Sequence, residues 1–292
     1  MIPKEVLKNI RRIQITTSRM VQDVFAGQYQ SVFKGRGMEF EEVREYQPGD
    51  EIRSIDWNVT ARMGHPYVKK FVEERELTVM LVLDMSASCS FGTVKQLKSQ
   101  LAAEICSVLA FSAIRNNDRV GFIAFTDRIE KFIPPRKGAR HVLRVIREAL
   151  CFKPCGSGTD IAMALEYLNR VTTRRAISFI ISDFYSADFK KMLAVSNKRH
   201  DIIAITITDP REEELPDIGI VKLDDPETGQ AFLVDTSDSR LRREYAQDSR
   251  KCLKAREMLF RSVDVDSIAV RTDAAYGQSL FRFFRARERR RR

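Results

Sequence analysis

The chain has 292 residues, of which 43% are hydrophobic and 31% are charged, enough to bury a sizeable core in one large domain or two modest ones. Its 18 phenylalanines and 7 tyrosines exclude disorder throughout, and its 13 glycines and 9 prolines exclude a collagen-like chain. The net charge is +10, but the run Arg282–Arg292 holds seven arginines and one glutamate, which supply six of those charges. The body of the protein is therefore only mildly basic.

No segment of the sequence has the character of a membrane span. The longest strongly apolar stretches, 77–83 and 101–114, fall short of the roughly 18–20 apolar residues that a spanning helix needs. No apolar run follows the basic residue near the start, so we expect no signal peptide. We therefore expect a cytoplasmic protein, and peripheral contact with a membrane remains open.

Cysteine and histidine provide little material for a disulfide framework, a zinc site or a Ser-His-Asp triad. The five cysteines are an odd number without the spacing of such sites, and we interpret them as reduced thiols packed as small hydrophobic side chains. The three histidines lie far apart in the sequence. Any metal site must therefore use oxygen ligands.

The first 75 residues differ in pattern from the rest of the chain. Apolar residues at helical spacing behind Pro3 predict a helix over 3–25, and the glycine- and proline-rich stretch 27–75 predicts a small, mostly β segment. We expect Trp57, the only tryptophan, to lie in a core. Five charged residues are interpreted as a buried ion-pair network that docks this segment onto the main domain, with a partner-binding face as the alternative: Arg44, Asp50, Arg53, Asp56 and Arg62.

Strands and helices alternate over the main domain, 76–275, which a C-terminal helix and arginine tail follow at 276–292. Strands are predicted at 77–83, 119–126, 129–133, 176–182, 201–208, 218–223, 231–235 and 267–271. Helices are predicted at 94–115, 139–150, 161–171, 187–198, 241–261 and 276–287. This pattern is typical of an α/β fold with a doubly wound, mostly parallel sheet, in which ligands bind at the carboxyl ends of strands.

Three polar segments are predicted to lie at the carboxyl ends of the strands, where ligands are expected. The sequence DMSAS begins at Asp84 after the first strand, GSGTD ends at Asp160 before a helix, and SDF follows another buried strand. Each alone also suits a helix cap or a turn. Together they offer two carboxylates and three hydroxyls, which are ligands that hard divalent cations prefer. We therefore predict a weak Mg²⁺ or Mn²⁺ site with one position open, formed by Asp84, Ser86, Ser88, Thr159 and Asp183.

These segments resemble the metal-ion-dependent adhesion site of von Willebrand factor A domains, and residues 77–208 resemble such a domain. The resemblance implies that Ser86, Ser88 and Thr159 supply hydroxyl ligands. It also implies that Asp84 and Asp183 coordinate the metal directly or through water. Cys89 departs from the pattern, because many such domains carry a larger apolar residue at that position.

The upstream segment also carries a resemblance. Gly37-Met38-Glu39-Phe40, Arg44-Glu45-Tyr46, Pro48-Gly49-Asp50, Arg53, Ile55-Asp56-Trp57 and Ala61-Arg62 resemble the signature of the bacterial family called domain of unknown function fifty-eight (DUF58). That family couples such a segment to a von Willebrand factor A-like domain. It implies a non-enzymatic protein-interaction module, an adaptor or chaperone cofactor of a MoxR-type AAA+ ATPase whose acidic residue completes the metal site.

Two other functions remain as alternatives. A phosphatase with Asp84 as nucleophile would require an acid at position 86, where the chain has serine, and the sequence contains no P-loop or dinucleotide-binding loop. The arginine tail could bind nucleic acid or an anionic membrane, although we interpret it as a solvated, frayed end.

Overall fold

The computed structural model describes residues 39–72, 76–224 and 230–291. The helix predicted over 3–25 and the hairpin turn predicted at 226–229 lie outside the described residues. The chain divides into two compact units, one formed by Phe33–Leu77 and one that contains Thr78–Arg292. Each unit is described by itself.

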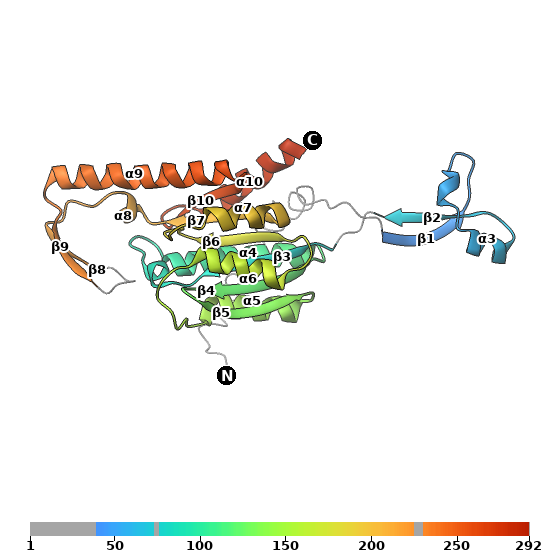
Figure 1. Ribbon diagram of the computed structural model, residues 1–292, viewed down its shortest axis with the longest axis horizontal. Helices are drawn as coiled ribbons and strands as arrows, with labels where there is room; N and C mark the ends of the chain where they lie inside the picture. Colours follow the sequence, from blue (N-terminus) through green and yellow to red (C-terminus); the bar gives the residue numbers. More distant parts are fainter. Residues whose placement is uncertain (1–38, 73–75, 225–229, 292) are drawn as a thin grey trace. The chain divides into compact units, whose positions relative to one another are not determined.

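The smaller unit is an antiparallel strand pair with short helices in its connection (Figure 1). Strand β1 (Glu39–Glu45) pairs with β2 (Tyr67–Val72), and the 3-10 turn η2 (Ile52–Ser54) and helix α3 (Trp57–Met63) lie between them in the chain. Helix α3 begins where Asp56 accepts hydrogen bonds from two main-chain amides and ends at Gly64, whose φ of 77° suits glycine. The predicted β character is confirmed, and α3 is an addition to it.

The polar and aromatic side chains of this unit are largely exposed when the unit is considered by itself. Arg44 forms a bidentate ion pair with Asp50 at 2.6 and 2.8 Å, its side chain is 40% exposed, and Arg53 and Arg62 are exposed as well. The ion-pair network that would dock this segment onto the main domain stays a prediction. The expectation that Trp57 is a core residue is wrong for this unit by itself, because 67% of Trp57 is exposed. A two-stranded sheet with one short helix has little interior in which to bury these side chains.

The larger unit contains a six-stranded sheet in the order β10-β7-β6-β3-β4-β5. All neighbours are parallel except β5, which runs antiparallel to β4. The strands are β3 (Thr78–Asp84), β4 (Arg119–Phe125), β5 (Ile129–Arg136), β6 (Ile177–Ser182), β7 (Asp201–Thr208) and β10 (Asp266–Arg271). The predicted α/β fold with a mostly parallel sheet is confirmed, and the strand order reverses where β6 and β4 flank β3.

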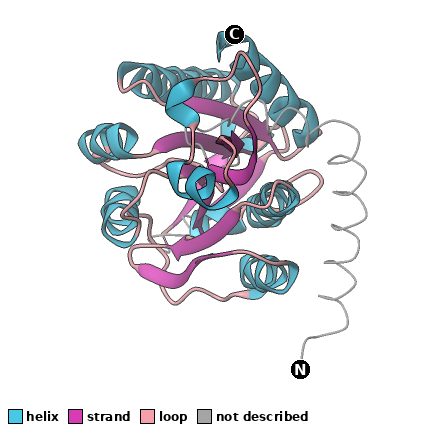
Figure 2. Ribbon diagram, turned by 90° about the vertical axis from the view of Figure 1, so that its right-hand side faces the viewer, coloured by secondary structure: helices cyan, strands magenta, loops and turns pink. Residues whose placement is uncertain are grey.

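Helices cover both faces of this sheet (Figure 2). On one face, α6, α7 and Phe260 of α9 pack against β3, β4, β6 and β7, while α4 packs against α5 and the strands β3 and β4. The helices are α4 (Lys98–Arg115), α5 (Ala139–Cys151), α6 (Ile161–Val171), α7 (Lys190–Arg199), α8 (Pro210–Glu213), α9 (Ser239–Ser262) and α10 (Tyr276–Arg291). The hairpin β8 (Ile220–Asp224) and β9 (Ala231–Asp235) lies between α8 and α9 in the chain. None of the helices within the described residues is long and apolar enough to cross a membrane.

The arginine-rich end is helical through Arg291 and is tied to the sheet. Arg287 pairs with Asp201 at 2.5 Å and with Asp266 at 3.4 Å, and Arg290 pairs with Asp266 at 3.0 Å. The interpretation of this run as a frayed tail is therefore wrong through Arg291, and Arg287 is buried, whereas 69% of the Arg290 side chain is exposed as expected. The aspartates begin β7 and β10, so the last helix is held against the edge where these strands start.

The thiols divide into two groups. Cys89 and Cys106 are buried, as expected for small hydrophobic side chains. The remaining three thiols are exposed, which corrects the interpretation that all five are packed in the interior: Cys151, Cys155 and Cys252.

Candidate metal centre at the strand ends

Asp84 is the last residue of β3 and is almost fully buried, with 1% of it exposed. One carboxylate oxygen, Oδ1, accepts a hydrogen bond from the Ser86 amide at 2.9 Å, and the other, Oδ2, accepts one from the Ser182 hydroxyl at 2.5 Å. Burial, followed by the negative charge of Asp183, raises the pKa of Asp84 to about 6. A cation beside these two carboxylates would relieve both effects.

Two serines extend from Asp84 toward the neighbouring strand. The chain after Ser86 turns into the short 3-10 helix η3 (Ala87–Ser90), which brings the Ser86 and Ser88 hydroxyl oxygens to 3.0 Å from each other. The Ser88 hydroxyl also donates a hydrogen bond to Asp183 Oδ2 at 2.8 Å. Adjacent oxygens in the octahedral shell of Mg²⁺ lie about 2.9 Å apart, so this series of three oxygens has the spacing of ligands around such an ion.

Asp183 follows β6 in a turn that packing holds in place. Its Oδ1 accepts a hydrogen bond from the Tyr185 amide at 3.2 Å, and its main-chain carbonyl accepts one from Arg256. The next residue, Phe184, has a φ of 59°, a conformation that costs energy for a residue other than glycine. The Phe184 ring packs at 5.0 Å from the ring of Phe260 in α9, which stabilises the turn and fixes the position of the Asp183 carboxylate.

The loop that carries Thr159 reaches the same edge through main-chain contacts. The Ser157 carbonyl accepts a hydrogen bond from the Ala87 amide at 2.9 Å, and the Thr159 carbonyl accepts one from the Ser186 hydroxyl at 3.1 Å. Gly156 packs so closely in this loop that an added Cβ would lie 2.0 Å from an Asp127 oxygen. The structure thus joins the side chains of Ser86, Ser88 and Asp183 by short contacts. It links Asp84 to them through the Ser86 amide, and it brings Thr159 to the same strand ends through main-chain contacts of its loop.

Three polar residues at this edge were not predicted from the sequence. Ser182 holds Asp84, as described above, and the other two are Lys98 and Glu212. Lys98 lies in the first turn of α4, where its ammonium is 2.7 Å from Asp183 Oδ2 and 2.5 Å from Glu212 Oε1. Burial alone would lower the pKa of Lys98, but the attraction of the two carboxylates outweighs it and raises that pKa. No sequence signal marked Lys98, because its neighbours Gln96, Ser99 and Gln100 are also polar.

The donor set fits a hard divalent cation. Among the described residues, no three or more His, Cys, Asp or Glu side chains form a group that could hold a metal ion. An ion at this edge would therefore depend on the Asp84 and Asp183 carboxylates, the serine hydroxyls and water, an all-oxygen set that suits Mg²⁺ or Mn²⁺. The Lys98 ammonium is the one feature that opposes such an ion, since it already contacts Asp183.

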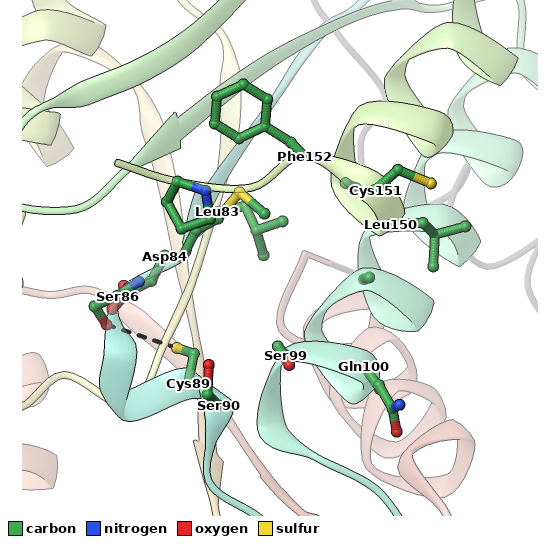
Figure 3. Close-up of a pocket in the computed structure, with 14 residues that line it drawn as sticks. Leu83, Asp84, Ser86, Cys89, Ser90, Ser99, Gln100, Leu150, Cys151 and Phe152 are labelled. Atoms are coloured by element: carbon green, nitrogen blue, oxygen red, sulfur yellow. Dashed lines mark hydrogen bonds between the residues drawn. The ribbon is translucent and has the colours of Figure 1, made fainter. Parts of the chain in front are cut away.

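Two hollows border this edge of the sheet. A cavity of about 290 Å³ lies between η3, the start of α4 and the end of α5, where Asp84 and Ser86 lie near Cys89 and Phe152 (Figure 3). A groove of about 490 Å³ includes Ser88 and Asp183 in its wall and extends toward α8 and β8. The apolar and aromatic members of that wall are Phe91, Tyr185, Leu215, Pro216, Ile218, Val221, Leu223 and Tyr245.

The sequence of this chain is similar to a known family and to several known proteins. Residues 42–255 match a family model described as protein of unknown function DUF58. The chain is 33% identical over 285 residues to uncharacterized protein Rv1480 of Mycobacterium tuberculosis, which covers 96% of this chain and 89% of that protein. YeaD of Bacillus subtilis is 24% identical over 162 residues, 55% of this chain and 38% of that protein.

Solved structures with a similar arrangement include the conserved hypothetical protein BatB from Bacteroides thetaiotaomicron. Its match has a TM-score of 0.46 and 16% identity, and covers 73% of this chain and 99% of that chain. The SpRpn10 VWA domain matches with a TM-score of 0.38 and 10% identity, and covers 70% of this chain and 94% of that chain.

Proposed function

Since the chain belongs to the DUF58 family of proteins of unknown function, we propose a function from its own site: a divalent-metal-dependent protein-interaction module without catalytic activity. The observation that carries the proposal is the series of oxygens from Ser86 through Ser88 to Asp183, at 3.0 and 2.8 Å, beside the buried Asp84. Mg²⁺ or Mn²⁺ would be held there by Asp84, Ser86, Ser88, Thr159 and Asp183.

A bound ion would attract an acidic partner. Two carboxylates and neutral hydroxyls leave an octahedral ion with coordination positions that water fills in the free protein. A carboxylate of a partner protein can replace such a water in a setting that is partly shielded from solvent, where the attraction is stronger than in bulk water. The partner we propose is a MoxR-type AAA+ ATPase, which this protein would serve as an adaptor in the cytoplasm.

The groove beside the site supports a protein partner over a small anion. Its wall continues from Ser88 and Asp183 to side chains such as Tyr185 and Ile218, which are 43% and 66% exposed. Exposed aromatic and aliphatic side chains around a polar centre are typical of protein interfaces. The segment that fits is therefore a loop with an acidic residue for the metal and a neighbouring apolar side chain for the groove.

The residue at position 86 disfavours the phosphatase alternative. Such an enzyme requires an acid there, whereas this chain has a buried serine. The alternative in which the arginine tail binds nucleic acid or a membrane is weakened for two of its arginines, because Arg287 and Arg290 are paired with aspartates of this chain.

Capture of the candidate ATPase tests the proposal. We expect immobilised protein to retain the ATPase in Mg²⁺ and to lose it in EDTA. We also expect Asp84→Ala and Thr159→Ala to abolish retention while circular dichroism shows a preserved fold. Equal capture with and without the chelator, together with capture by Asp84→Ala, would reject a metal-dependent interaction.

Substitution in the groove tests the apolar contact separately. Ile218→Asp places a charge in the groove wall, and Met258→Asp is the matched control, because Met258 is 63% exposed on α9 and is not part of that wall. We expect only the first variant to lose the ATPase, with Mg²⁺ affinity unchanged in both. Equal capture by both variants would remove the groove from the interface.

A further inference from the structure

Lys98 is the most buried cation at the candidate metal centre. Its side chain is 1% exposed, and its ammonium contacts Asp183 and Glu212 at 2.7 and 2.5 Å. A buried lysine is costly unless it is paired, and here two carboxylates pair with it. The ammonium therefore compensates negative charge of Asp183 and Glu212 at the candidate metal centre.

The ammonium shares an oxygen with the proposed ligand set. Asp183 Oδ2 accepts hydrogen bonds from both Lys98 Nζ, at 2.7 Å, and the Ser88 hydroxyl, at 2.8 Å. The oxygen that would complete the spacing around a metal ion is thus already in contact with a positive charge. A divalent ion on the same oxygen would repel the ammonium strongly, because little water is present to screen the two charges.

Glu212 is positioned to hold the Lys98 ammonium near the site when a divalent ion binds Asp183. Its Oε1 contacts Lys98, while its Oε2 accepts a hydrogen bond from the Asp209 amide at 2.9 Å. Asp209 is fixed in turn by the hydroxyls of Thr93 and Thr272, at 2.5 and 2.6 Å. The second partner of Lys98 therefore stands on a rigid support outside the set of proposed metal ligands.

We propose that Lys98 is a tethered cation that neutralises Asp183 in the metal-free protein, so that a divalent ion binds only by taking Asp183 from it. This inference rests on the proposed function, because it concerns the same site. Metal affinity is then set by a competition within the protein: Lys98 weakens the binding of the ion and stabilises the empty site. Glu212 retains the displaced ammonium, so metal binding also changes the charge at α8 and the groove wall.

Replacement of the lysine by an uncharged side chain of similar length separates the two effects. Lys98→Met removes the competing charge, and Lys95→Met is the matched control, because Lys95 is an exposed lysine three residues earlier whose ammonium contacts the Asp273 carbonyl. Titration calorimetry with Mg²⁺ measures affinity. We expect Lys98→Met to bind Mg²⁺ about tenfold more tightly than the natural protein and Lys95→Met to bind it equally.

Thermal unfolding in EDTA measures the stabilising role without metal. We expect Lys98→Met to melt at a lower temperature than the natural protein, and Mg²⁺ to raise its melting temperature by more than that of the natural protein. If Lys98→Met does not fold, Lys98→Met/Glu212→Gln removes the partly buried carboxylate that the first change leaves without Lys98, and this double variant is titrated in its place. A purely structural lysine would lower stability without improving metal affinity.

The outcomes distinguish this proposal from the function on which it rests. Unchanged or weaker Mg²⁺ binding by the folded Lys98 variants, with binding by the natural protein, overturns the tethered cation and leaves the metal-dependent module intact. Absence of binding by all proteins at millimolar Mg²⁺ overturns both. Binding by the Lys98 variant alone supports the competition in its strongest form.

Discussion

Two cations in this protein are each held by a pair of carboxylates. One pair lies at the carboxyl ends of the strands of the sheet, and the other lies at the amino ends. Lys98 lies where β6 ends and is 1% exposed, whereas Arg287 lies where β7 and β10 begin and is 10% exposed. The partners are Asp183 and Glu212 for Lys98, and Asp201 and Asp266 for Arg287. The cluster around Arg287 also contains Arg290, which pairs with Asp266 at 3.0 Å, and the two clusters lie in different surroundings.

The surroundings decide what each cluster can do. The aspartates that hold Arg287 begin two adjacent parallel strands, so the pair fixes α10 to the edge of the sheet. Beside Lys98, in contrast, the Ser88 hydroxyl shares an oxygen of Asp183 with the ammonium. The proposed metal ligands therefore lie beside Lys98 and not beside Arg287. We predict that substitutions beside Lys98 alter both metal binding and stability, whereas substitutions at Arg287 alter stability alone.

The largest effect is expected from Asp183→Asn. This change removes a carboxylate from the proposed ligand set and leaves the buried ammonium with one charged partner. We expect Mg²⁺ affinity to fall about 100-fold or more, and the free energy of unfolding in EDTA to fall by about 3 kcal/mol. Calorimetry and urea unfolding measure the two quantities, and a variant that unfolds more easily but binds Mg²⁺ normally would assign Asp183 a structural role only.

Asp84 provides a prediction on pH. Its pKa of about 6 lies above the ordinary value of 3.8, so between these limits the folded metal-free protein holds a proton that the unfolded chain has released. Its contribution to the free energy of unfolding therefore falls as pH rises from 3.8 to 6, by about 3 kcal/mol in total. Since a metal must replace this proton, Mg²⁺ affinity should fall about tenfold per pH unit below 6.

Asp84→Asn serves as the reference for both measurements. In EDTA, the variant should lack the Asp84 contribution and be more stable than the natural protein at pH 7, by up to about 3 kcal/mol. Urea unfolding of the two proteins at pH 4, 5, 6 and 7 gives the difference directly. A difference that stays constant over this range would show that the carboxyl group titrates normally.

Arg287→Met tests the cluster at the start of β7 and β10. The substitution removes the ion pair of Arg287 with Asp201 and leaves Asp266 paired with Arg290, and we expect the free energy of unfolding to fall by about 2 kcal/mol with Mg²⁺ affinity unchanged. Arg289→Met, at an exposed position of the same helix, is the matched control and should change stability little. Altered Mg²⁺ affinity in Arg287→Met would show that the two clusters are coupled.

The smallest effect is expected from deletion of Arg289–Arg292. This removes the ion pair between Arg290 and Asp266, in which the Arg290 side chain is 69% exposed. An exposed pair contributes less than about 1 kcal/mol, so folding and Mg²⁺ binding should persist. A shift of many degrees in the melting temperature, or loss of the ATPase in the capture assay, would identify the end of the chain as a docking element.

The predicted and observed elements agree most closely for the buried strands, which the sequence marks by runs of apolar residues. Largely apolar runs predicted the strands that end at Asp84 and Ser182 to within a residue or two, because a strand covered on both faces is apolar over most of its length. The predicted start of α4 at residue 94 was wrong, because the helix begins at Lys98 and the polar residues before it form a loop. Trp57 was misplaced because an aromatic side chain is buried only if its unit has an interior.

By itself, the sequence determined the α/β alternation of the larger unit and which oxygen-bearing side chains follow its strands, because both depend on short-range periodicity. Only the tertiary structure decided which charges meet. Lys98 is separated in sequence by 85 residues from Asp183 and by 114 from Glu212. No local pattern encodes that pairing, because it arises when the first turn of α4 packs beside the turn after β6 and the segment after β7.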